Sequence, residues 1–426
     1  MKTKSIEQLL HFLNNSPTAW HAVANTKKEL LKNGFKELSE EESWKLKLGH
    51  KYFVIRNGSS LCAFTLPKKT PKKFKIAASH TDSPSLKLKP NATFTKENMI
   101  MLGTEIYGAP LLTSWLNRDL AIAGRIICTD AKGTTQEKLV YIDNHPVIVP
   151  QLAIHLDRNV NESGPVLNKQ EHLAAVAGIT NKKENGDFLE KILKTAVPFK
   201  NLLSYDLFLV PIELARLLGG HGELISSYRI DSLVSVYAIL QGFLEKSGNE
   251  GETVRMITFW DSEEIGSTTA QGAGSPFLEQ TLERICLSLN LTREEYFQII
   301  HRSLCASVDL GHALHPNYAD KHDPRHTVLM NQGVILKVNA QNRYASDARS
   351  SAEIVKLCDE HNIPLQKYVS RGDIPCGSTV GPIHSQQTGM ATVDIGISQL
   401  SMHSARELVG TDDYLSLTSL LTLFLS

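Results

Sequence analysis

The chain has 426 residues, which is more than one ordinary hydrophobic core holds and predicts about two domains. Hydrophobic residues make up 42% and charged residues 21% of the sequence, values that exclude a disordered or collagen-like chain. The 45 basic and 45 acidic residues give a formal net charge of zero, so we expect neither a nucleic-acid nor a membrane partner.

The six cysteines are scattered along the chain without a closely spaced pair, a pattern typical of a protein kept in a reducing compartment. Polar residues interrupt every apolar run near the N-terminus, so we expect no secretory signal there. No segment reaches the roughly 20 apolar residues of a membrane-spanning helix. We therefore expect a cytoplasmic location.

The first 50 residues predict two helices, because apolar side chains recur in them at helical spacing. The first helix contains Ile6, Leu9 and Leu13, and the second runs to Gly34, a residue type that commonly follows a helix. The next strand patterns lie at residues 51–57, 60–66 and 73–79. The last of these strands leads directly into His80, and α/β proteins place their chemistry at such strand ends.

Residues 91–230 have a different pattern, and we expect them to form an inserted second domain that is mainly β. Their strand patterns lie at residues 120–128, 138–142 and 146–150. One helical pattern covers residues 186–195. On this interpretation, residues 1–90 and 231–426 are the two parts of the first domain.

After Asp231 the helical and strand patterns alternate, beginning with a helix over residues 232–246. The strand patterns that follow lie at residues 254–261, 304–309, 333–339 and 392–398. Strands that alternate with helices predict an α/β sandwich with a largely parallel sheet.

Ionisable side chains follow several of these predicted strands. They are His80, Asp82, Asp231, Asp261, Glu263, Glu264, Asp309, His312, His315 and His403. Because strand ends in an open α/β sheet converge on one crevice, we expect these residues to share a site. A set of histidines and carboxylates suits a divalent ion such as zinc, cobalt or manganese.

Two adjacent metal ions would need a bridging carboxylate and, beside them, an unligated carboxylate that takes a proton from water. Glu263 and Glu264 are neighbours that point in different directions, so one can bind metal while the other acts as the base. Each residue also has an ordinary alternative, since Glu-Glu is common on helix surfaces and Asp231 or Asp309 could cap a helix or turn. Their joint occurrence at five strand exits favours the metal site.

Eight motifs occur together and in order: SHTDSP, SWLNRDLAIAGR, IHLDRNVNE, DSEEIGS, SVDLGHALHPNY, NRYASD, PCGSTVGP and MHSARE. With them the chain resembles the aspartyl aminopeptidase family of dinuclear zinc metallopeptidases over nearly its whole length. The resemblance implies a zinc-exopeptidase-like α/β/α sandwich with an inserted dimerisation domain at residues 91–230. It also implies two divalent metal ions per subunit, zinc in the first place and cobalt or manganese as alternatives.

The resemblance further implies a role for each matched residue. Asp231 would bridge the two ions, within the ligand set His80, Asp231, Glu264, Asp309 and His403. Glu263 would be the general base, and Asp82 would orient His80. The implied substrate contacts are His155, His312, Lys337, Tyr344, Gly377, Ser378 and Met402, of which His155 would reach into a neighbouring subunit. The resemblance implies dimers that assemble into a tetrahedral dodecamer.

The implied activity is hydrolysis of the N-terminal residue of peptides, preferably Asp or Glu, by a metal-bridged hydroxide with Glu263 as the base. Three alternatives stay open: an apolar, Leu-type preference, a related dinuclear amidohydrolase such as a deacylase or carboxypeptidase, and a non-catalytic assembly protein. Two positions depart from the family pattern, namely Asn117 in WLNRDL and Ser232 after Asp231.

Overall fold

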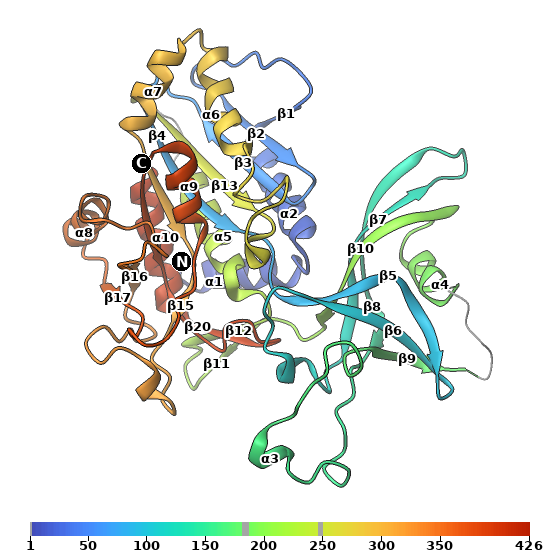
Figure 1. Cartoon of the computed structure of the whole chain (residues 1–426). Coiled ribbons are helices and arrows are strands. Elements are labelled where there is room, and N and C mark those ends of the chain that lie inside the picture. The colour runs from blue at the N-terminus through green and yellow to red at the C-terminus, as the bar shows by residue number, and fades with distance from the viewer. Residues whose placement is uncertain (1, 181–186, 246–249) are drawn as a thin grey trace. The chain divides into compact units, whose positions relative to one another are not determined.

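The computed structural model describes residues 2–180, 187–245 and 250–426 (Figure 1). The chain divides into two compact units. The first unit comprises Met1–Asp82, Ala215–Met402 and Glu407–Ser426, and the second comprises Ser83–Leu214 and His403–Arg406. The predicted domain boundaries and the dimerisation role of residues 91–230 stay predictions.

A large mixed sheet forms the centre of the first unit. Its order is β1-β2-β3-β13-β4-β14-β18-β16-β17. The strands are β1 (Lys36–Leu38), β2 (Lys51–Arg56), β3 (Ser60–Thr65), β4 (Lys73–His80), β13 (Thr253–Trp260), β14 (Leu304–Val308), β16 (Val334–Lys337), β17 (Leu365–Tyr368) and β18 (Ala391–Gly396). The four middle strands β13, β4, β14 and β18 are parallel, as predicted. Antiparallel pairs of β3 with β2 and of β16 with β18 make the flanks mixed.

Helices cover both faces of this sheet, which confirms the predicted α/β/α sandwich. One core contains side chains of α1 (Lys2–Asn14), α2 (Ala19–Lys32), α5 (Ile230–Glu245), α8 (Ala348–His361) and α10 (Thr411–Phe424). The other contains side chains of α6 (Phe277–Ser288), α7 (Arg293–His301) and α9 (Val380–Thr388). Because side chains alternate along a strand, Ala77 packs in the first core and its neighbours Ile76 and Ala78 in the second. The predicted helices before Gly34 and after Asp231 are confirmed, with residue 246 outside the described residues.

A second, smaller sheet of the first unit was not predicted. Its strands, in order, are β11 (Arg216–Leu218), β12 (Leu224–Ser227), β20 (Glu407–Gly410), β19 (Ser398–Leu400) and β15 (Gly311–His312). Segments of two to four residues are too short to show an alternating pattern. This sheet fixes the backbone of His312, one of the predicted substrate contacts.

The second unit contains an antiparallel sheet in the order β8-β7-β10-β5-β6-β9. Its elements are β5 (Ser85–Lys96), β6 (Met99–Tyr107), η1 (Leu112–Trp115), β7 (Leu120–Thr129), β8 (Thr135–Val147), α3 (Val160–Ser163), β9 (Ala175–Ile179), α4 (Asp187–Ala196) and β10 (Asn201–Pro211). The predicted strands at 120–128 and 138–142 and the helix near 190 are confirmed, with residue 186 outside the described residues. The strand predicted at 146–150 is confirmed in part, because β8 ends at Val147 and Ile148 forms an isolated antiparallel bridge with Val176.

Asn117, one of the two departures from the family pattern, forms a turn within the second unit. Its φ is +58°, a left-handed conformation that asparagine tolerates better than most residues. Its Oδ1 accepts a hydrogen bond from the backbone N–H of Gln151 at 2.9 Å, and its own N–H donates to the carbonyl of Val149 at 2.9 Å. The amide therefore has a local structural function.

Among the described residues, none of the helices has both the length and the apolar character needed to cross a bilayer.

Candidate metal and catalytic site

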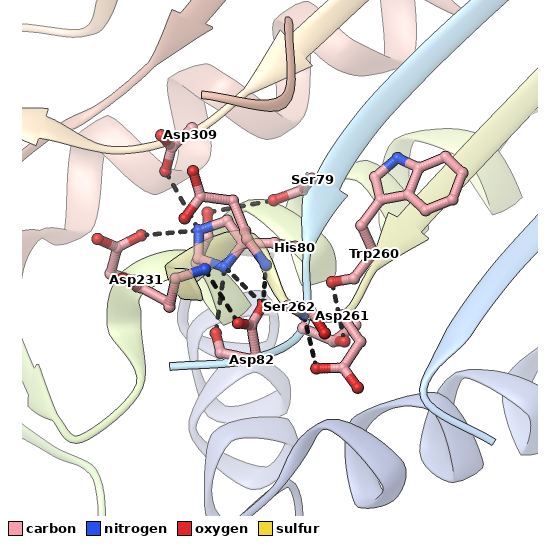
Figure 2. A network of polar contacts seen from close by, with 12 residues as sticks. Ser79, His80, Asp82, Asp231, Trp260, Asp261, Ser262 and Asp309 are labelled. Carbon is pink, nitrogen blue, oxygen red and sulfur yellow. Dashed lines mark hydrogen bonds and ion pairs between the residues drawn. The ribbon is translucent and has the colours of Figure 1, made fainter. Parts of the chain in front are cut away.

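Three strand or helix ends bring buried ionisable side chains together in the first unit (Figure 2). His80 is the last residue of β4, and Asp309 follows β14 directly. These two strands are parallel neighbours, so their ends lie at the same edge of the sheet. Asp231 lies in the first turn of α5, where its backbone angles are not helical (φ −82°, ψ 108°) and differ from those of the regular helix that follows. The predicted convergence of these residues is present.

The imidazole of His80 lies between three acidic residues. Its Nε2 is 3.2 Å from Oδ1 of Asp231 and 3.5 Å from Oδ1 of Asp309. Its Nδ1 is 3.1 Å from the backbone carbonyl oxygen of Asp82. Because a carbonyl oxygen only accepts hydrogen bonds, this contact assigns a proton to Nδ1 and directs Nε2 toward the two carboxylates.

Glu263 and Glu264 complete the cluster from the short helix η2 (Glu263–Ile265), which begins three residues after the last residue of β13. His80, Glu263 and Glu264 offer ligand atoms that lie within 4.8 Å of one another, and Asp231 and Glu264 do so as well. The two glutamates therefore reach the same centre as the aspartates.

The carboxylate of Asp82 holds the turn that carries both glutamates. Its Oδ1 accepts a hydrogen bond from the backbone N–H of Glu263 at 3.1 Å, and its Oδ2 accepts one from Glu264 at 3.1 Å. The same carboxylate lies 3.6 Å from Nδ1 of His80. Asp82 thus caps the 263–264 turn, whereas its predicted role in orienting His80 stays a prediction.

This contact leads to a prediction for Asp82→Asn. The amide keeps one acceptor oxygen and places an NH2 group against the second N–H, so the turn that carries the two glutamates loosens. We expect kcat to fall about 10- to 100-fold, the usual effect of removing a group that supports metal ligands. Steady-state kinetics with zinc analysis of the purified variant measures this, and a variant with wild-type kcat would exclude a supporting role for the Asp82 carboxylate.

The cluster carries more negative charge than its protein partners neutralise. Burial, and then the carboxylates of Asp309, Asp82 and Asp231, raise the pKa of Glu263 to about 8 against the lowering effect of His80. Burial alone would lower the pKa of His80, but its contacts with the three aspartates hold that pKa well above its usual value. Both shifts favour the protonated forms of Glu263 and His80.

The donor set and its spacing fit a divalent ion. Ligand atoms about 2.0–2.2 Å from one tetrahedral zinc ion lie roughly 3.3–3.6 Å from one another. The separations of 3.2 and 3.5 Å from His80 Nε2 to Asp231 and Asp309 match this spacing. A cation between these atoms would also offset the charge that raises the pKa of Glu263.

Lys337, predicted to contact substrate, is the last residue of β16 and is only 1% exposed. Its Nζ donates to the carbonyl of Leu310 at 3.0 Å and lies 3.4 Å from Oδ2 of Asp309. The same nitrogen is 4.9 Å from the ring centroid of Tyr344. Lys337 and Tyr344 therefore lie together beside a proposed metal ligand.

The other predicted substrate contacts of the first unit lie in three places. His312 and Gly377 line a cavity of about 390 Å³. Ser378 follows Gly377, and its Oγ donates to the carbonyl of Arg343 at 3.2 Å. Met402 is partly buried and packs against the core. Their roles toward substrate stay predictions.

His155 and His403 belong to the second unit. His155 is exposed, and Nδ1 of His403 lies 3.1 Å from the carbonyl oxygen of Ala109. The metal-ligand role of His403 and the substrate contact of His155 stay predictions.

Two buried residues near the site escaped the sequence analysis. Arg229 is buried and donates to the carbonyl of Thr81, which ties the segment before Asp231 to the loop after His80. Asp394 is fully buried in the middle of a largely buried strand. A carboxylate inside such a strand indicates a structural or functional role, since unpaired acids are rarely buried completely.

Ser232, the second departure from the family pattern, is also buried beside the site. Its Oγ is 3.1 Å from the hydroxyl of Ser79, one residue before His80. The serine pair joins the start of α5 to β4.

Comparison with known proteins shows the family of the chain. Residues 12–425 match the family model described as aminopeptidase I zinc metalloprotease (M18). The chain is 41% identical to a "Probable M18 family aminopeptidase 2" of Clostridium novyi, covering 97% of this chain and 96% of that protein. It is 36% identical to a "Probable aspartyl aminopeptidase" of Ricinus communis, covering 95% of this chain and 91% of that protein.

Among solved structures, the fold is similar to that of a dodecamer of the aminopeptidase mApe1 from S. cerevisiae. The TM-score is 0.86 at 26% identity, and the match covers 98% of this chain and 95% of that one. With the family match over nearly the whole length and the buried His-carboxylate centre, the chain belongs to the M18 family of zinc aminopeptidases.

Proposed function

We propose that this chain is an aminopeptidase of the aspartyl type, which uses two zinc ions to remove N-terminal Asp or Glu from peptides. The observation that carries the proposal is the buried cluster in which His80 faces Asp231 and Asp309. This set would hold one ion. Asp231, Glu264 and His403 would hold the second, with Asp231 bridging and cobalt or manganese as alternative metals.

The bound ions would lower the pKa of a shared water and polarise the scissile carbonyl. Glu263 takes the proton of the attacking water and transfers it to the leaving amine. The position of Glu263 in a turn held by Asp82 supports this role, because the carboxylate is fixed beside the ligand cluster. Either Tyr344 or His155 of the partner subunit donates a hydrogen bond to the developing oxyanion, an effect worth about 3 kcal/mol.

The preference for an acidic N-terminal residue would come from Lys337, whose ammonium group would pair with the substrate carboxylate. The buried Lys337 beside Tyr344 supports this assignment, because a cation in a desolvated site discriminates strongly between charged and apolar groups. Since Lys337 also contacts Asp309, its replacement should affect every substrate to some degree.

For Lys337→Leu we therefore expect a loss of kcat/KM of about 100-fold or more on Asp-peptides and a much smaller loss on Leu-peptides. The Leu-peptide serves as the internal control for damage to the metal site. Measured losses of equal size on both substrates would remove Lys337 from the specificity pocket and would leave its contact with Asp309 as its main role.

A panel of reporter amides tests the proposed function as a whole. The purified enzyme is supplied with zinc, manganese or cobalt and given Asp-, Glu- and Leu-amides, an N-acetyl-Asp amide and a peptide with a reporter at its C-terminus. We expect cleavage of the Asp- and Glu-amides and none of the acetylated one, because an aminopeptidase needs the free α-amine. Faster cleavage of the Leu-amide would favour the apolar type, and cleavage of the acetylated amide a deacylase.

We also propose that the protein forms dimers that assemble into a dodecamer. Support comes from the dodecameric mApe1 and from large apolar side chains that are exposed in the second unit, namely Leu152, Leu156 and Val166 at 56, 75 and 87%. Sedimentation velocity of the purified protein tests this assembly. The cytoplasmic location is likewise a proposal, supported by six cysteines that are all free thiols.

A further inference from the structure

Asp394 connects two segments that carry proposed substrate contacts of the first unit, that of Tyr344 and that of Gly377 and Ser378. It lies on β18 and has no exposed surface. Its Oδ2 accepts a hydrogen bond from the backbone N–H of Ala345 at 2.6 Å, and its Oδ1 accepts one from the hydroxyl of Thr379 at 2.7 Å. One carboxylate thus holds residues adjacent to Tyr344 and to Ser378.

The backbone of Asp394 adds a further link to the first of these segments. Its N–H donates to Oγ of Ser346 at 2.8 Å, so both the side chain and the main chain of Asp394 hold the 345–346 segment. Ser378 in turn donates to the carbonyl of Arg343, which joins the two segments to each other. The loop before α8 and the loop before α9 are therefore fixed as one body.

The third segment, β16 with Lys337, is connected to Asp394 by charge. Burial raises the pKa of Asp394, while the positive charge of Lys337 and the hydroxyls of Ser307 and Thr379 lower it. The ammonium group of Lys337 therefore acts on this carboxylate as well as on Asp309. Asp394 is thus hydrogen-bonded to the residues next to Tyr344 and Ser378, and the charge of Lys337 acts on it as well.

Packing around the carboxylate leaves little room for adjustment. A Cβ at Gly381, in the first turn of α9, would lie 2.4 Å from Oδ2 of Asp394. Thr379, which donates to Asp394, also caps α9 by accepting the backbone N–H of Gly381 at 3.2 Å. The position of the first turn of α9 is therefore fixed by its close packing and hydrogen bond to Asp394.

We propose that Asp394 is a positioning residue for substrate binding, which fixes Tyr344 and Gly377–Ser378 in the arrangement that receives the N-terminal residue of the peptide. The inference rests on the proposed function, because it takes these residues as substrate contacts. Asp394 itself touches neither the substrate nor the proposed metal ligands in this arrangement. Its effect reaches the substrate through Ala345 and Thr379.

The test compares Asp394→Asn with a matched control elsewhere in the unit. Asp413 is also a fully buried carboxylate and accepts two backbone N–H groups, those of Asn331 and Gly333, both at 2.7 Å. Asp413→Asn therefore makes the same substitution at a buried, hydrogen-bonded carboxylate without touching the segments at Tyr344 and Ser378. Melting temperature, zinc content, kcat and KM are measured for both zinc-loaded variants.

We expect both variants to lose thermal stability and to keep their zinc. Only Asp394→Asn should raise KM for an Asp-amide and the inhibition constant of free L-aspartate, each about 10- to 100-fold. The inhibition constant isolates the effect on binding, because L-aspartate forms no oxyanion and any loss of kcat through a displaced Tyr344 does not enter it. The substitution displaces the two loops and leaves the metal centre in place. KM and the inhibition constant should therefore rise while the zinc content stays constant.

A second pair of variants keeps the test decisive if Asp394→Asn does not fold. Thr379→Val removes the hydroxyl that donates to Asp394, whereas Thr379→Ser keeps it. The valine variant should show the raised KM, and the serine variant should restore the wild-type value.

Two results would overturn the inference. Unchanged KM and L-aspartate inhibition in the Asp394 or Thr379→Val variant, in an active enzyme, would reduce Asp394 to a stabilising residue like Asp413. A wild-type protein that neither cleaves aminoacyl amides nor binds L-aspartate would instead remove the proposed function, and the inference with it. The wild-type measurement, made first, separates the two failures.

Discussion

Replacing Glu263 with Gln is expected to lower kcat on the order of 10³-fold, within the range contributed by general acid–base catalysis. The amide has the size of the carboxylate and keeps the hydrogen bond that its backbone N–H donates to Asp82, but it cannot take a proton from water. KM and zinc content should stay near the wild-type values. Steady-state kinetics and metal analysis of the same preparation measure both.

Glu264→Gln is the control for this experiment, because it makes the same change at the neighbouring position of the same turn. Glu264 is proposed to bind metal, so its variant should lose zinc affinity, and its activity should partly return at high zinc concentration. Glu263→Gln should not respond to added zinc. If the two variants behave in the opposite way, the assignments of base and ligand are exchanged.

Removal of the metal is expected to abolish activity and to make the stability of the protein depend on pH. The pKa of Glu263 in the metal-free folded chain is about 8, against 4.5 for an ordinary glutamate. Between these values the folded form binds a proton that the unfolded chain has lost. Rising pH therefore destabilises the metal-free fold, by up to about 1.4 kcal/mol per pH unit for one such group. The raised pKa of His80 acts in the same direction above pH 6.5.

The measurement is the melting temperature of chelator-treated and zinc-loaded protein between pH 6.5 and 8. Over this range the melting temperature of the metal-free protein should fall, and the difference between the two forms should widen. His21 and His384, whose burial lowers their pKa to about 4, contribute their pH dependence below this range. A constant difference across the range would mean that the cations do not displace protons from the Glu263 cluster.

Local sequence patterns predicted the fold where one face of an element is buried in a regular way. The two N-terminal helices and the strands before His80 and Asp261 follow from apolar spacing alone. Their buried residues in the sandwich recur with the period of a helix or of a strand. The start of β5 was missed although Leu86 and Leu88 alternate there with Lys87 and Lys89, the period-2 pattern of a half-buried strand. The alternation ends at Pro90 and Asn91, so it is too short to predict the full length of the strand.

The sequence predicted the ionisable side chains of the candidate site. It did not predict the hydrogen bonds that hold those side chains in place. The positions of His80, Asp231, Asp309 and the two glutamates follow from their places after strands. The capping of the 263–264 turn by Asp82 joins residues about 180 positions apart, and no local pattern contains that information. Asp394 was treated as part of a strand, because its partners at Ala345 and Thr379 are defined only by the folded sheet.

The wide separation of His80, Asp231 and Asp309 along the chain has a consequence for biogenesis. Contacts between such distant segments form late, since each requires closure of a long loop. A nascent or partly folded chain would therefore offer no high-affinity place for zinc until β4, β14 and the start of α5 have all docked. Uptake of the ion would report completion of this sheet, and newly made chains would compete poorly for scarce metal before that point.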